Sequence, residues 1–178
     1  MTTKEIFLLV QEELYAQNVD TEIKEDEIVW TDHYGAENSV SAWQTAVSDN
    51  GWAAWWILND VGNDMVKIWL CKDTVITWHP PLNTIGHPAF GVRLQFFENF
   101  LIVRYHDKHR ERFFIFNIHT LNKTEIFFMP SKFKSYGNEL IVGKNFNNQL
   151  LKITTYPDRM EKEEVDEEYM KIRNIKFD

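Results

Sequence analysis

The feature that most constrains the fold is a succession of short apolar runs between residues 28 and 156, each rich in β-branched and aromatic side chains. Turn-forming segments such as SDNG, NDVGND, DKHRE and SYGN separate the runs, and helical spacing of apolar residues is absent throughout this stretch. Short strands joined by tight turns predict about ten or eleven antiparallel strands in a meander of hairpins. We therefore expect a mainly β fold.

The N-terminal segment has a different pattern. Apolar residues recur three and four positions apart, which predicts a helix within residues 1–18 with Thr3 as its N-cap. A chain of 178 residues is long enough to bury a substantial core and is most simply one domain. We expect that single domain to span residues 1–178.

The aromatic run WAAWWIL, residues 52–58, has apolar side chains on both faces when it is drawn as a strand. A strand with one face in water shows alternating polar residues, so this strand is expected to be covered on both sides. Large aromatic side chains are mostly buried, and we interpret the run as core. Cover on both faces favours a sandwich or a barrel, with blade-like stacked hairpins as a further arrangement.

Two acidic segments account for the formal net charge of −8. Residues 21–27 carry a net −3 and residues 158–168 a net −5, so the rest of the chain is neutral overall. General nucleic-acid binding is not expected, because it requires several Lys or Arg side chains against the phosphates. The acidic tail, residues 157–178, is predicted to form a short helix and then an extended end, with these residues on one helical face: Val165, Tyr169 and Ile172.

The sequence contains no recognisable catalytic or metal-binding signature. The single cysteine, Cys71, excludes an intramolecular disulfide and a thiolate metal cluster within one chain. No GxSxG, Walker, GxGxxG or HExxH motif occurs. Asp32 beside His33 has the residue types of an acid–base pair, but nothing identifies a nucleophile. We expect a protein that is not an enzyme and that has no cofactor and no metal.

The beginning of the chain lacks the basic region and the cleavage site of a signal peptide. No apolar run approaches the ~18 residues that a membrane-spanning helix needs. We expect a cytoplasmic protein without membrane association. The glycosylation sequon that begins at Asn122 is accordingly expected to be unused.

Two functions fit these observations. The first is binding of a macromolecular partner, perhaps basic, as inhibitors and immunity proteins do, because acidic segments speed and direct association. The second is binding of a small ligand or sugar in an aromatic-lined pocket of a β-barrel or sandwich. The residues expected to contact a partner lie in the acidic segments and in the charged hairpin tip RYHDKHRERF: Glu25, Asp26, Glu27, Arg104, His106, His109, Arg110, Glu163 and Glu164. The residues expected to contact a ligand are tryptophans and two histidines of a proline-rich loop: Trp43, Trp55, Trp56, Trp78, His79 and His87.

Overall fold

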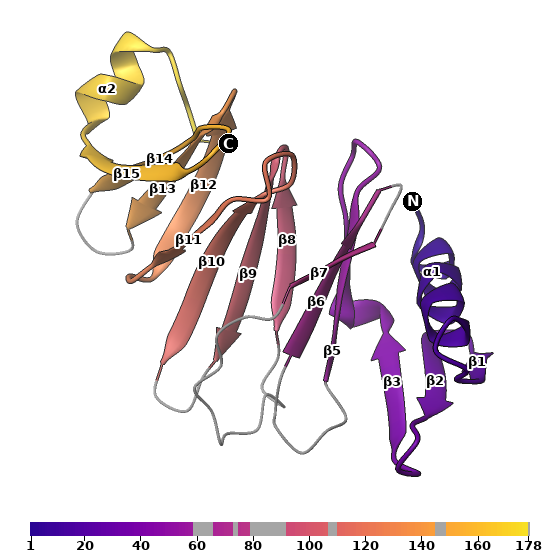
Figure 1. Cartoon of the computed structure of the whole chain (residues 1–178). Coiled ribbons are helices and arrows are strands. Elements are labelled where there is room, and N and C mark those ends of the chain that lie inside the picture. The colour runs from indigo at the N-terminus through magenta and orange to yellow at the C-terminus, as the bar shows by residue number, and fades with distance from the viewer. Residues whose placement is uncertain (59–65, 73–74, 79–91, 107–109, 145–148, 178) are drawn as a thin grey trace. The chain divides into compact units, whose positions relative to one another are not determined.

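The computed structural model describes residues 1–58, 66–72, 75–78, 92–106, 110–144 and 149–177. In these residues the protein is mainly β, with an N-terminal helix and a short C-terminal helix, as expected (Figure 1). The strands form four separate sheets in which each strand pairs with the next along the chain. The fold is therefore a series of meander sheets and not a closed barrel.

The chain divides into two compact units, which are described separately. One comprises Met1–Leu94 with Tyr105–Arg110, and the other comprises Gln95–Arg104 with Glu111–Asp178. Each unit contains a cluster of buried apolar side chains contributed by more than one sheet. The division cuts across the strands at residues 93–97 and 100–106, because residues 93–94 and 105–106 belong to the first unit.

The first unit begins with a helix against a three-stranded sheet. The N-cap is Thr2 and not Thr3. The Thr2 hydroxyl accepts a hydrogen bond from the Glu5 backbone amide, and the Glu5 carboxylate accepts one from the Thr2 backbone amide. Asn18, with φ of 59°, turns the chain away from the helix. The elements are α1 (Thr3–Tyr15), β1 (Thr21–Ile23), β2 (Glu27–Thr31) and β3 (Glu37–Ser41).

The aromatic run lies in the second sheet of this unit. Trp55 is fully buried and packs in one cluster with Ile6 of α1 and Val40 of β3. Its neighbour Trp56, on the opposite face of the strand, is 3% exposed. The interpretation of this run as core is confirmed for residues 53–56, whereas Trp52 is half-buried. The elements are η1 (Ala42–Gln44), β4 (Thr45–Val47), β5 (Ala53–Leu58), β6 (Val66–Cys71) and β7 (Val75–Trp78).

In the second unit, two sheets share a core and a helix covers the far face of one of them (Figure 1). Phe100 and Ile115 of the first sheet pack with Leu140 and Ile153 of the second, and all four are fully buried. The first sheet contains β8 (Arg93–Phe97), β9 (Phe100–His106), β10 (Glu111–Asn117) and β11 (Lys123–Ile126). The second contains β12 (Pro130–Tyr136), β13 (Glu139–Lys144), β14 (Leu150–Thr155) and β15 (Met160–Val165), followed by α2 (Glu167–Ile172).

The acidic tail differs from its prediction. Residues 160–165 form β15, which pairs with β14 along its whole length, and the helix begins only at Glu167. Ile172, expected on the packed face, is 78% exposed, whereas Met170 and Ile175 are buried against β13 and β14. Fifteen strands are present in the described residues, more than expected, because several are short and polar or charged.

Candidate functional site

Strand β15 presents an unusual arrangement of ion pairs on the β12–β15 sheet. Lys152 Nζ lies 2.7 Å from Glu163 Oε2, and Lys144 Nζ lies 2.8 Å from Glu164 Oε1. The two glutamate side chains are 65% and 70% exposed, whereas the lysines are 15% and 20% exposed. In both pairs the cation is shielded and the carboxylate faces outward.

The electrostatics of these pairs favour their charged forms. The hydrogen bond to Glu163 raises the pKa of Lys152, and burial opposes this only in part. The hydrogen bond from Lys144 lowers the pKa of Glu164. Lys152 also lies over the Tyr169 ring, with 5.0 Å from Nζ to the ring centroid. The two lysines are thus held in place on opposite faces of the sheet, Lys152 beside Tyr169 and Lys144 over the ring of Phe128.

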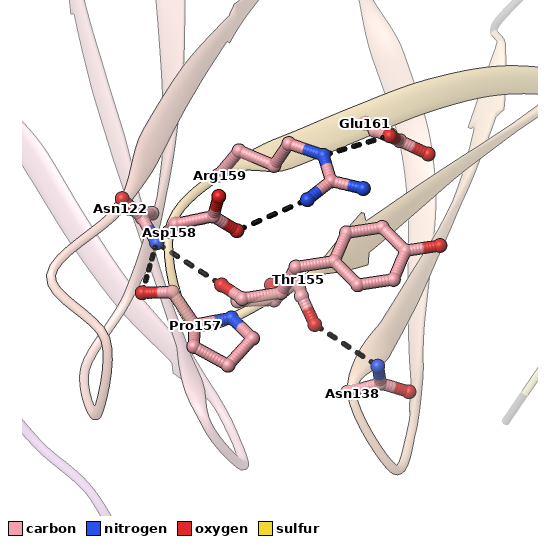
Figure 2. Close-up of polar contacts among 8 residues, drawn as sticks. Asn122, Asn138, Thr155, Pro157, Asp158, Arg159 and Glu161 are labelled. Atoms are coloured by element: carbon pink, nitrogen blue, oxygen red, sulfur yellow. Dashed lines mark hydrogen bonds and ion pairs between the residues drawn. The ribbon is translucent and has the colours of Figure 1, made fainter.

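Asparagine side chains from neighbouring hairpins hold the turn from which β15 starts (Figure 2). The Asn122 amide donates to the carbonyls of Tyr156 and Pro157 at 3.1 and 3.3 Å. The Asn138 amide donates to the Thr155 carbonyl at 2.9 Å. Three turns of the second unit are therefore tied together at this point. The Asn122 nitrogen is the atom that a glycan would modify, and here it is engaged with the backbone.

The acidic surface continues onto this turn. Figure 2 shows Arg159 between Asp158 and Glu161, with Nη1–Oδ1 and Nε–Oε1 distances of 3.0 and 2.9 Å. The guanidinium also lies over the Tyr156 ring, 4.4 Å from its centroid. Both carboxylates remain more than half exposed. The exposed acids of β15 and its turn, Asp158, Glu161, Glu163 and Glu164, are called the β15 acidic row below; Glu161 and Glu163 lie on the α2 face of this edge strand, and Glu164 lies on the opposite face.

A buried carboxylate anchors α2 on the same sheet. The Tyr169 hydroxyl donates to Glu139 Oε2 at 2.8 Å, and Arg173 Nη1 lies 3.4 Å from the same oxygen. Burial raises the pKa of Tyr169, and the hydrogen bond to Glu139 adds to this. Lys152 and Arg173 both lie over the Tyr169 ring, so the anchor is continuous with the Lys152–Glu163 ion pair.

The other acidic segment lies in the first unit. Glu25 and Asp26 are exposed in the turn between β1 and β2. Glu27 is half-buried at the start of β2, and its carboxylate lies 3.9 Å from Lys24 Nζ. These three residues therefore form part of a turn, and only two of them project freely into solvent.

The charged hairpin tip is described only in part. Arg104 is bound by Glu111 across the β9–β10 hairpin, with Nε 3.0 Å from Oε1, and Arg110 is exposed. His109 lies outside the described residues, as do His79 and His87 of the proline-rich loop. The side chains of His106 and Trp78 are likewise outside the described part. The expected roles of these residues stay predictions.

The remaining tryptophans occupy different environments. Trp55 is fully buried and offers no accessible surface to a ligand. Trp43 is 63% exposed and packs edge-on against Trp56, with 5.3 Å between ring centroids. Ligand binding by Trp43, Trp55 and Trp56 stays a prediction, and Trp43 is the exposed residue of the three.

Asp32 organises a turn. Its carboxylate accepts hydrogen bonds from the backbone amides of Tyr34 and Ala36 and from the side chain of Asn38. The hydrogen bond from the Ala36 amide contributes most to lowering the pKa of Asp32. These contacts occupy both carboxylate oxygens within the β2–β3 hairpin, so Asp32 has a structural role there.

Three further features bear on the function. In the residues that the structure describes, no group of three or more His, Cys, Asp or Glu side chains is placed to hold a metal ion. No helix in those residues is both long and apolar enough to cross a membrane. Comparison of the chain with protein-family models, curated proteins and solved structures finds no match.

Proposed function

We propose that the protein is a non-enzymatic cytosolic protein that binds a basic macromolecular partner through the β15 acidic row. The observation that carries this proposal is the orientation of the ion pairs of Glu163 and Glu164, whose lysine partners are shielded beneath them. Such carboxylates are already held in one place, so less side-chain freedom is lost when a partner binds. Their negative charge also steers a basic surface toward them.

The position of the row on an edge strand supports the same function. β15 is the last strand in the order β12–β13–β14–β15. Charged side chains on an edge strand discourage pairing with the edge of another chain, because like charges come together. The row therefore disfavours association with a second copy of this chain and favours a partner of opposite charge. Inhibitors and immunity proteins that cover a basic enzyme surface are a class with this property.

Replacing two acids of the row tests the proposal. We compare wild type with E163Q/E164Q and with the matched control E12Q/E37Q, in which two exposed acids of the first unit are neutralised. Immobilised proteins are exposed to an octalysine peptide and to cell extract at low and high salt. We expect the control to bind like wild type, and E163Q/E164Q to bind octalysine more weakly and to lose basic proteins from the extract. Equal retention by both variants would refute the proposal.

A further inference from the structure

The second unit also contains a groove whose charged lining residues are mostly lysines, in contrast to the β15 acidic row. The groove has a volume of about 720 Å³ and lies between the α2 face of the β12–β15 sheet and the chain from α2 onward. Part of its floor is apolar, since Leu150, Met170 and Ile175, which are largely buried, and the half-buried Phe177 all line it. We call it the α2 groove.

Gly143 explains how the groove is shaped. A side chain at this position would place its Cβ 2.8 Å from Lys132 Cγ and 3.1 Å from Ser131 Oγ. Because glycine has no side chain, Lys132 lies flat across β13, and its Nζ reaches a point 4.3 Å from the centroid of the Phe177 ring. The aliphatic part of Lys132 thus packs on the sheet while its ammonium stays at the groove.

The rim of the groove is basic, although the protein as a whole is acidic. Lys132, Lys171 and Lys176 line it, and none of the three forms an ion pair with another described residue. Lys144 also lines it but is bound by Glu164. The one carboxylate among the described lining residues is Glu167. Unneutralised ammonium groups beside an apolar floor define a site for a ligand that is anionic at one end and apolar at the other.

We propose that the α2 groove binds a small amphipathic anion, namely a carboxylate or phosphate carried on an apolar body. The apolar body lies on Met170, Ile175 and Phe177, and the anionic group is neutralised by the lysines of the rim. Binding here does not depend on the β15 acidic row, so the ligand is additional to the proposed basic partner.

The first test uses 8-anilinonaphthalene-1-sulfonate, an aromatic anion whose fluorescence rises in apolar sites. Its titration into wild type is compared with K171Q/K176Q and with K4Q/K72Q, which neutralises two exposed lysines of the first unit. We expect the dissociation constant to rise about tenfold in K171Q/K176Q, from the loss of two favourable charge interactions, and to stay unchanged in the control. Circular dichroism verifies folding, and K132Q provides a second variant. Equal affinity in all proteins would overturn the proposal.

Competition experiments define the ligand class. Laurate and phenyl phosphate distinguish a carboxylate from a phosphate head group, and displacement of the probe by either one supports the proposal. Inorganic phosphate is expected not to displace the probe, because it lacks an apolar body. The neutral analogue N-phenyl-1-naphthylamine is expected to bind more weakly. Equally tight binding of this analogue, or displacement by an oligoglutamate peptide but by neither small anion, would overturn the proposal.

The variant E163Q/E164Q separates this inference from the proposed function. Glu163 and Glu164 do not line the groove, so the probe is expected to bind as tightly as in wild type. Loss of octalysine binding with retained probe binding supports both proposals independently. Loss of probe binding in this variant, with folding intact, would contradict the assignment of the ligand to the lysine rim.

Discussion

At the scale of single residues, the hydroxyl of Tyr169 has the most clearly defined contact. It donates a hydrogen bond to the buried carboxylate of Glu139 at 2.8 Å. Arg173 Nη1 lies farther from that carboxylate, at 3.4 Å. In Y169F the carboxylate loses its best donor while the ring remains. We expect the free energy of unfolding to fall by about 1–2 kcal/mol, because a buried acceptor is left poorly satisfied. Urea denaturation measures this, with Y136F, at a half-exposed tyrosine, as the control.

The same contact predicts a pH dependence. The pKa of Tyr169 is raised, so the folded protein holds the phenolic proton more tightly than the unfolded chain does. The stabilisation is complete below the ordinary tyrosine pKa of about 10 and is lost as the pH rises through the higher folded value. Absorbance at 295 nm is expected to show one tyrosine that titrates late, and Y169F is expected to lack it. If Y169F instead lost amplitude near the ordinary pKa of about 10 and kept the late step, the coupling would be absent.

Gly143 offers a second prediction for a single position. In G143A the new methyl group meets Lys132 Cγ at 2.8 Å, and the lysine must leave its place across β13. We expect a loss of about 1–2 kcal/mol in unfolding free energy, typical of a modest steric conflict. Removing the obstructing side chain in K132A/G143A is expected to make the combined loss smaller than the sum of the two single losses. Strict additivity in this double-mutant cycle would contradict the contact.

Some residues could be assigned from the sequence and others could not. The burial of Trp55 follows from its own run, because apolar side chains on both faces of a strand require cover on both sides. The partners of Glu163 and Glu164 could not be found in this way. Lys152 and Lys144 lie on other strands, so these pairs depend on the strand register and on the fold of the unit. The need for glycine at position 143 likewise follows only from the position of the Lys132 side chain in the folded sheet.

At the scale of elements, β15 depends on the turn that precedes it. Asn122 and Asn138 donate to three carbonyls of that turn (Figure 2). We expect N122A and N138A each to lower the free energy of unfolding by about 1 kcal/mol. Amide hydrogen exchange is expected to accelerate in β14 and β15, while exchange in α1 stays unchanged as an internal control. Acceleration spread evenly over α1 and β15 would contradict a local role for the asparagines.

β15 lies in the tail, where the sequence predicts a short helix and then an extended end. The sequence MEKEEV contains residues that favour helices, and its acids were assigned to the solvent. In the structure these residues pair with β14, where Lys152 lies opposite Glu163 and compensates for low strand propensity. Met160 packs in the core between the two sheets, on the other face of the strand. Tertiary pairing outweighed the local preference, and only the short helix after Asp166 followed the predicted pattern.

At the scale of the whole molecule, the sequence does not specify how many sheets the strands form. The alternation of apolar runs and turns indicates hairpins wherever it occurs, so the mainly β class was predictable. It does not specify where one sheet ends and the next begins, because hairpins within a sheet and connections between sheets have similar lengths. The division into two compact units has no marker in composition, and the expected single domain stays a prediction.

A substitution in one core tests whether the two units unfold together. Trp55 is fully buried in the first unit, so W55A is expected to lower the free energy of unfolding by about 3–5 kcal/mol. Because the second unit has its own cluster around Leu140 and Ile153, we expect exchange protection to fall in α1 and β1–β5 and to persist in β12–β14. I153A is the reciprocal variant, with the opposite pattern expected. Uniform loss of protection in both variants would instead establish one cooperative domain, as the sequence predicts.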